Sequence, residues 1–297
     1  MATAFKQPDL QTLIGLHVSD LARDGYCVIR NAVSRSHIAA LSADLDDRFR
    51  KTPLCDGGFY GRATKRFGGV LKRSRHAAAL IEHELVLGIT DRFLLPHCQR
   101  YNLNLTQGIE IHPGALAQFP HRDQDMWHGP KGEIEYLVNV MWPFTDYTAD
   151  NGSTVIWPGS HKCQGVHSMP AEEAISIEMQ PGDVLLFLGS TLHGGGENRT
   201  KQARRGMIVS YALGWLKPFE NQWLVYPPEI ARSFSRSLAS LVGYSQHKPN
   251  LGNYEGRCPS ILLHDNVPDY LAATDELLPE QYEGVANFIT DQQTGAR

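Results

Sequence analysis

The sequence predicts a mainly β fold with flanking helices, built on a double-stranded β-helix of the jelly-roll or cupin-like kind. From residue 103 to residue 216, short segments rich in β-forming residues are separated by turns that contain Gly and Pro, as in double-sheet jelly rolls. No helical pattern alternates with these segments, which argues against a parallel α/β sheet. The expected strands cover residues 107–112, 115–119, 136–142, 154–157, 175–179, 184–188 and 207–215.

The first 102 residues combine helices with one strand. Apolar residues recur at helical spacing over 10–22 and stop at Asp24-Gly25, after which Tyr26-Cys27-Val28-Ile29 predicts a strand. The pattern predicts further helices over 34–49 and 77–95. Between these two helices, residues 56–69 are rich in glycine and aromatic residues. We expect this segment to be either a mobile lid over a site or an ordinary surface loop.

From residue 217 the pattern changes again, to a helix over 228–241 followed by loops punctuated by Gly and Pro. No linker, internal repeat or low-complexity tract divides the chain, and 297 residues suit one large core with extensions. We therefore expect a single domain over residues 1–297. It would consist of a helical part with the lid loop (1–102), a jelly-roll core (103–216) and a C-terminal extension (217–297).

Charge and cysteine content limit the partners and the compartment. Asp and Glu number 32 and Lys and Arg 28, giving a formal net charge of −4, and no basic cluster resembles a nucleic-acid surface. No apolar run approaches the ~18 residues of a membrane span, and the first residues lack the apolar core of a secretory signal. Five widely spaced cysteines without a Cys-x-x-Cys motif fit a reducing cytoplasm. We expect a cytoplasmic protein that acts on a small molecule, without a nucleic-acid or membrane partner; a homodimer is left open.

Three side chains have the composition of a metal site. His121 and Asp123 stand two residues apart, so a strand would point both toward one face while Arg122 points away. His193 follows the apolar run 184–188 and can supply a third ligand from another strand end. Two imidazoles and one carboxylate with open positions form the facial triad of non-haem Fe(II) oxygenases. Alone, His-x-Asp is a weak signal, and its ordinary interpretation is a solvated strand end.

An arginine twelve residues beyond His193 adds a second element. Arg205 begins the strand-like run 205–211, and its guanidinium could bind a carboxylate in bidentate fashion. Arg204 lies next to it, and strand alternation lets only one of the two point inward.

Other residues compete for the metal. Asp125 also lies on the same face as His121 in an extended segment, but at twice the separation it needs a turn to reach the same ion. Four further histidines stand beside Pro or Gly turns without a carboxylate at matching spacing, which favours a role other than ligation: His112, His128, His161 and His167.

Five ordered motifs together resemble the phytanoyl-CoA dioxygenase family of iron(II)/2-oxoglutarate oxygenases, in its natural-product branch. They are His121-x-Asp123, Asn151-Gly152-Ser153-Thr154 running into Pro158-Gly159-Ser160-His161, Pro181-Gly182-Asp183, His193, and Arg205. The resemblance covers nearly the whole chain and is specific from Gln118 to Arg205.

The resemblance implies a role for each matching residue. His121, Asp123 and His193 would bind Fe(II), and Arg205 would hold the far carboxylate of 2-oxoglutarate. Gln118, Thr154 and an arginine before the core would also contact this cosubstrate. We take that arginine as Arg66, with Arg62 close by as the alternative.

The activity implied is oxidation of an unactivated C–H bond of a small, secondary-metabolite substrate, using O₂ and 2-oxoglutarate and releasing succinate and CO₂. Hydroxylation is the default outcome, with desaturation, epoxidation or rearrangement as variants. Because Asp123 is retained, the resemblance argues against halogenation. Two alternatives remain from the residues alone: a zinc-type hydrolase, or a non-catalytic cupin-like module that binds a metal or ligand. Neither alternative needs a carboxylate clamp.

Overall fold

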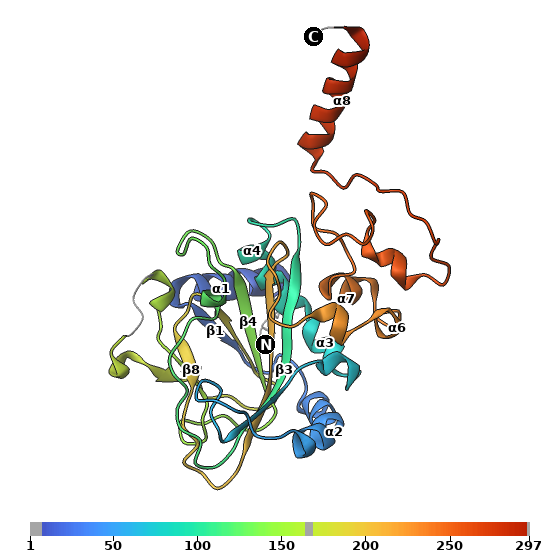
Figure 1. Ribbon diagram of the computed structural model, residues 1–297. Coiled ribbons are helices and arrows are strands. Elements are labelled where there is room, and N and C mark those ends of the chain that lie inside the picture. Colours follow the sequence, from blue (N-terminus) through green and yellow to red (C-terminus); the bar gives the residue numbers. More distant parts are fainter. Residues whose placement is uncertain (1–7, 164–168, 296–297) are drawn as a thin grey trace, which may run out of the picture. The chain divides into compact units, whose positions relative to one another are not determined.

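A computed structural model describes residues 8–163 and 169–295 (Figure 1). The chain divides into two compact units, Met1–Asn221 and Gln222–Arg297, and each is described by itself. The expectation of a single domain over residues 1–297 stays a prediction. None of the described helices combines the length and the apolarity needed to cross a membrane.

A six-stranded antiparallel sheet forms the larger layer of the first unit. Its strand order is β1-β7-β4-β9-β3-β2. Going across the sheet, the bounds are β1 Tyr26–Ile29, β7 Val184–Leu188, β4 Leu137–Pro143, β9 Arg204–Leu213, β3 Tyr101–Ile111 and β2 Thr64–Phe67. Every residue of β4 and β7 is buried, as expected for central strands covered on both faces.

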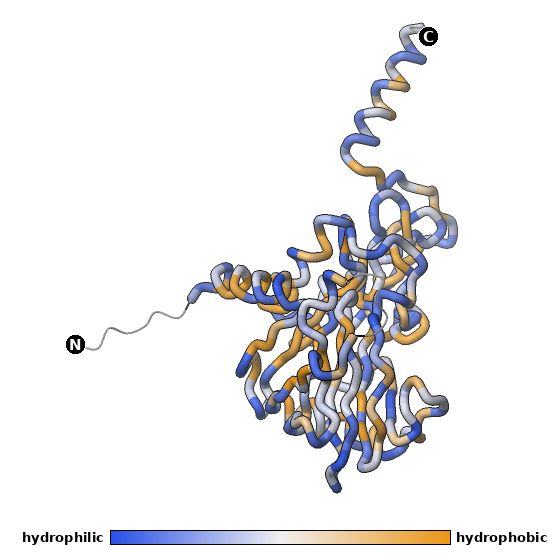
Figure 2. Tube along the Cα trace, turned by 90° about the vertical axis from the view of Figure 1, so that its left-hand side faces the viewer, coloured by the Kyte–Doolittle hydropathy of each residue, from blue (hydrophilic) through white to orange (hydrophobic). Residues whose placement is uncertain are grey.

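A smaller three-stranded sheet faces the first one. It contains β6 Ile175–Ser176, β5 Thr154–Ile156 and β8 His193–Gly195, in the order β6-β5-β8. Apolar side chains from both sheets meet in one core, including Ile109, Met141, Ile156 and Phe187. Figure 2 shows apolar stretches of chain in this part of the molecule, with polar stretches between them. The predicted jelly-roll core with flanking helices is confirmed.

Helices from the first hundred residues pack beside the large sheet. They are α1 Leu10–Asp24, α2 Arg35–Lys51, α3 Ala77–Ile81 and α4 Glu84–Leu94. Helix α1 contacts β1 and α4, and α4 contacts β4 and β9. Asp9 and Ser34 cap the first two helices by accepting hydrogen bonds from Thr12 N and His37 N.

Gly25 ends α1 in a crowded place. Its φ is +81°, and a Cβ there would lie 2.5 Å from both His161 Nδ1 and Thr191 Oγ1. We expect Gly25→Ala to lower the free energy of unfolding by about 1–3 kcal/mol, because it adds both a strained left-handed backbone and a steric clash. Urea unfolding measures this.

A matched control is Gly15→Ala, inside α1, where an added Cβ meets nothing within 4 Å. That variant should leave the free energy of unfolding unchanged or raise it by ~0.5–1 kcal/mol. Equal destabilisation by both substitutions would contradict the explanation.

Several sequence predictions need correction. Residues 115–119 form an extended segment without a strand, and the helix expected over 77–95 is broken between α3 and α4. Strand β6 is shorter than the predicted 175–179, and β2 and β8 were not expected. The first unit also contains short 3-10 helices at Val70–Lys72, Asp123–Met126, Ser160–Lys162 and Ala171–Glu173.

The second unit contains short helices and one longer one. The helix expected over 228–241 is two helices, α6 Pro228–Ala231 and α7 Arg236–Leu241, preceded by α5 Gln222–Val225. A 3-10 helix spans Pro259–Leu263. The final helix, α8 Pro279–Thr294, was predicted to be loop, and its tube alternates between apolar and polar in Figure 2.

Candidate metal centre

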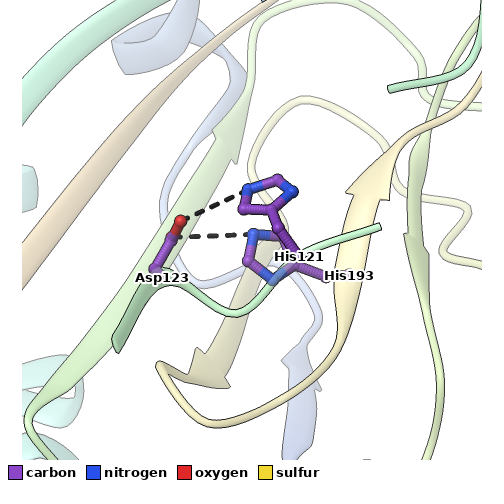
Figure 3. A group of neighbouring side chains, drawn as sticks. All are labelled: His121, Asp123 and His193. Carbon is purple, nitrogen blue, oxygen red and sulfur yellow. Dashed lines mark ion pairs between the residues drawn. The ribbon is translucent and has the colours of Figure 1, made fainter. Parts of the chain in front are cut away.

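Backbone pairing brings His121 together with His193, the first residue of β8. The two residues form an antiparallel bridge in which His121 N donates to His193 O at 2.9 Å and His193 N donates to His121 O at 3.0 Å. Their imidazole centroids are 4.4 Å apart. Asp123 begins the 3-10 helix Asp123–Met126, and this turn directs its carboxylate toward both rings (Figure 3).

The three side chains offer their donor atoms to one point. His121 Nε2 lies 3.3 Å from Asp123 Oδ1, and His193 Nε2 lies 3.6 Å from Asp123 Oδ2. One ligand atom from each residue can be chosen so that all lie within 4.8 Å of one another. Within residues 8–163 and 169–295 no other group of His, Cys, Asp or Glu meets this criterion.

Backbone carbonyls select the tautomer of both imidazoles. His121 Nδ1 lies 2.8 Å from Phe119 O, and His193 Nδ1 lies 3.0 Å from Thr191 O. Because a carbonyl oxygen only accepts, each Nδ1 must carry the proton when the ring is neutral, which leaves the Nε2 lone pair free. Second hydrogen bonds of this kind orient metal-binding histidines. The donor set therefore fits a divalent transition metal.

The protonation states of the three side chains also favour metal binding. Burial lowers the pKa of His193 to about 4, so this ring is neutral at pH 7. Burial opposes ionisation of Asp123, but the neighbouring His193 and His121 lower the pKa of this carboxyl to about 2. Burial also disfavours the charged form of His121, yet the hydrogen bond and charge of Asp123 raise its pKa overall. A metal bound here would replace the proton that His121 shares with Asp123.

Asn139 supports the carboxylate from the centre of the large sheet. This buried residue of β4 donates from Nδ2 to Asp123 Oδ2 at 3.0 Å. We expect Asn139→Leu to weaken metal affinity about 10- to 100-fold, the usual effect of losing a group that orients a ligand. Competition against a fluorescent chelator measures this affinity.

Thr148 lies outside the site's lining, so Thr148→Val serves as the control and should leave metal affinity unchanged. Unchanged metal affinity in Asn139→Leu would contradict the assigned role.

The metal-ligand candidates open into a cavity of about 360 Å³, here called the metal cavity. Aromatic rings flank both imidazoles: Phe59 lies 4.9 Å from His121 and Phe187 lies 4.6 Å from His193, centroid to centroid. Further walls come from β3, β4 and β9, which contribute polar side chains as well as apolar ones such as Ile109, Met141 and Ile208. Phe59 and Tyr60 belong to the predicted lid segment, which therefore lies at the site; its mobility stays a prediction.

The structure corrects the choice between the two neighbouring arginines. Arg204 is 2% exposed and lines the metal cavity, where one Nη donates to Tyr147 Oη at 2.8 Å and the other to Gly152 O. The Arg205 side chain is 28% exposed and points to the other face of β9. It pairs there with Glu110 and, at 2.6 Å, with Asp46. Arg204, one strand position away, is therefore the member of this pair that lines the metal cavity, and the cosubstrate contact expected of Arg205 stays a prediction.

The other expected cosubstrate contacts line the metal cavity. Arg66 does so, whereas Arg62 does not. Gln118 and buried Thr154 also line it, and Gln118 Oε1 accepts from Gly195 N at 3.2 Å. Arg66 Nε and Arg204 Nε are buried without a hydrogen-bond partner among the described residues. Two guanidinium groups in the lining of the cavity that contains the triad are suited to a carboxylate.

The rival ligands are placed elsewhere. Asp125 lines the metal cavity but lies exposed, outside the cluster of three donors. His112 pairs with Glu110 at 2.7 Å, and His161 Nε2 lies 3.1 Å from Ala22 O. His128 is exposed, and His167 lies outside the described residues. The sequence analysis missed Asn139 and Phe59, whose positions depend on strand pairing and loop path.

Fold and site together define a jelly-roll metalloenzyme with a two-histidine, one-carboxylate centre. A model of the phytanoyl-CoA dioxygenase (PhyH) family matches residues 21–206. The chain belongs to this family, and its class is that of the 2-oxoglutarate-dependent dioxygenases.

Fungal relatives support this classification. Multifunctional dioxygenase prhA of Penicillium brasilianum is 31% identical over 240 residues, which cover 74% of this chain and 79% of that protein. Dioxygenase aneA of Aspergillus aculeatus is 32% identical over 231 residues, covering 72% and 77%. Dioxygenase trt7 of Aspergillus terreus is 28% identical over 240 residues, covering 75% and 82%.

Solved structures share the fold. The non-haem α-ketoglutarate-dependent epimerase SnoN from nogalamycin biosynthesis superimposes with a TM-score of 0.56 at 15% identity, covering 68% of this chain and 84% of that one. HygX from Streptomyces hygroscopicus, with nickel, 2-oxoglutarate and hygromycin B bound, gives 0.54 at 16% identity, covering 68% and 88%.

Proposed function

We propose that His121, Asp123 and His193 hold Fe(II) in this dioxygenase and that 2-oxoglutarate and O₂ are its cosubstrates. The observation that carries the proposal is the cluster of three donors with both histidine Nδ1 atoms engaged by carbonyls. Iron bound there would couple the decarboxylation of 2-oxoglutarate to succinate and CO₂ with oxidation of a substrate C–H bond. SnoN with Fe³⁺ and α-ketoglutarate, and HygX with nickel and 2-oxoglutarate, lend support by analogy of fold.

The protein's contribution is positioning and exclusion of water. Arg204 and Arg66 would bind the carboxylates of 2-oxoglutarate, because the side chains of both arginines line the metal cavity. Gln118 and Thr154 offer an amide and a hydroxyl from the same cavity, suited to carboxylate or keto oxygens. Arg205, which is engaged with Glu110 and Asp46, is replaced by Arg204 in this proposal.

The substrate we propose is a small secondary metabolite, oxidised at an unactivated C–H bond. Support comes from the size of the metal cavity and from the apolar side chains in its walls, since small-molecule sites combine apolar walls with placed polar groups. The structural neighbours include enzymes whose structures hold nogalamycin RO or hygromycin B. A cytoplasmic location, fitting the five free cysteines, is also proposed, and a homodimer stays a prediction.

Succinate formation tests this function against the two alternatives. The protein should release succinate only when iron, 2-oxoglutarate and O₂ are all supplied. Zinc-dependent turnover without 2-oxoglutarate would favour the hydrolase, and metal binding without turnover of 2-oxoglutarate would favour a binding module. The two arginines in the lining of the metal cavity favour the oxygenase, because neither alternative needs a pair of cations there.

A further inference from the structure

A second cavity of about 420 Å³ adjoins the metal cavity, and we call it the side cavity. Five residues line both spaces, so they form the partition between them: Tyr60, Arg66, Ile111, Gln118 and Gly195. The partition contains the two polar side chains already proposed to contact 2-oxoglutarate, Arg66 and Gln118. Whatever occupies the side cavity thus reaches the same guanidinium from the opposite direction.

The rest of the side cavity is lined with little side-chain bulk. Half of its lining residues are glycine or alanine, among them Gly58, Ala63, Ala117 and Gly196. A Cβ built at Gly58 meets nothing within 4 Å, so open space lies beside this wall. Small side chains at this wall and the volume of the side cavity leave room for a small ligand there.

The charge of the side cavity has a single sign. Its charged lining residues are Arg62 and Arg66, and no Asp or Glu lines it. Arg62 is exposed, and no hydrogen bond or ion pair engages its guanidinium within the described part of the chain. Arg66 is largely buried, and its side chain lies over the Tyr60 ring at 5.0 Å and donates to Gln107 Oε1 at 3.0 Å. The guanidinium of Arg62 is thus exposed to solvent, and that of Arg66 lies at the partition between the two cavities.

The outer part of the metal cavity has the opposite character. Asp125, Met126 and Phe219 are exposed residues of its lining, so this opening presents apolar groups and a negative charge. A dianion is attracted by the arginines of the side cavity and repelled by the carboxylate of Asp125. An apolar metabolite is suited to the other opening.

We propose that the side cavity is the route by which 2-oxoglutarate enters and succinate leaves, separate from the opening that admits the oxidised substrate. This inference rests on the proposed function. Arg62 attracts the dicarboxylate, and Arg66 receives it at the partition, where the side-chain oxygen of Gln118 accepts a hydrogen bond from Gly195 N at 3.2 Å. The keto acid can then exchange while substrate occupies the metal cavity.

Rates of 2-oxoglutarate binding test the route. Under anaerobic conditions, stopped-flow mixing of iron(II)-loaded full-length protein with 2-oxoglutarate gives association and dissociation rate constants. A side chain that only obstructs a route slows both rates by the same factor and leaves Kd unchanged. We expect Ala117→Trp and, independently, Gly58→Trp to slow both by roughly tenfold. Phe219→Trp, which narrows the other opening, should leave both rates at the wild-type values.

Charge gives a second readout. Arg62→Gln should lower the association rate roughly three- to tenfold at low ionic strength and flatten its salt dependence. Arg75→Gln removes the same charge from an exposed arginine outside both cavities and should change neither.

Wild-type exchange rates in both Ala117→Trp and Gly58→Trp would overturn the route, as would slowing by Phe219→Trp alone. Wild-type protein that binds no 2-oxoglutarate and forms no succinate would instead reject the proposed function.

Discussion

Asp123→Asn is expected to abolish stable iron binding and to lower succinate formation by at least a factor on the order of 10³, because loss of a metal ligand removes several kcal/mol of stabilisation. Asp123 is the member of the cluster that reaches both imidazoles, at 3.3 and 3.6 Å. An amide cannot supply its negative charge, and its NH₂ group would face either a histidine lone pair or the metal. Iron content after dialysis and succinate formation measure the two effects.

The matched control is Asp125→Asn, two residues away on the same 3-10 helix. Asp125 is exposed and outside the donor cluster, so this variant should bind iron at wild-type stoichiometry. His193→Ala should behave like Asp123→Asn, and exposed His128→Ala like the wild type. Loss of iron in Asp125→Asn with retention in Asp123→Asn would show that the ligand had been misassigned.

Arg204→Gln should raise the Kd of 2-oxoglutarate about 10- to 100-fold, the loss expected when charge-assisted hydrogen bonds of ~1.5–3 kcal/mol are removed. The side chain lies in the metal cavity with its Nε unsatisfied. Arg204→Lys keeps the charge but not the planar fork, so it should recover affinity only in part. Titration of the iron-loaded protein with 2-oxoglutarate measures the Kd.

Arg205→Gln provides the control from the same strand. It removes the ion pairs with Glu110 and Asp46 and leaves buried Glu110 with Lys65 at 3.6 Å and His112 at 2.7 Å. This variant should lose stability while its Kd for 2-oxoglutarate stays at the wild-type value. A raised Kd in Arg205→Gln alone would restore the assignment made from sequence.

The pair Arg204 and Arg205 shows where sequence reasoning stops. Spacing from His193 identifies the neighbourhood, but a one-residue change in strand register exchanges the two faces. Ile208 and Ser210 line the metal cavity together with Arg204, so the even positions of β9 face inward. Pairing with β3 sets this register, matching Arg205 with Glu110, and no local pattern in 204–213 specifies it.

The fold was predictable wherever the local pattern was strong. The predicted strand 26–29 matches β1, which begins directly after the turn at Gly25. The apolar run 184–188 matches β7, whose residues are all buried. The clustering of His121, Asp123 and His193 could also be predicted, because all three lie in short motifs, and their binding of a metal stays a prediction. Strand β8, with two glycines in three residues, carries no β-forming signal and exists through pairing with β5. Asn139 lies between apolar neighbours in β4, and its role could be recognised only from its contact with Asp123.

The most direct test of the iron centre is a single-turnover measurement on protein loaded anaerobically with a known amount of Fe(II). One iron per chain should bind, and exposure to O₂ should give succinate in proportion to bound iron only when 2-oxoglutarate is present. Two results would contradict the proposed iron centre: succinate formed equally well by the Asp123→Asn protein, or turnover supported by zinc without 2-oxoglutarate.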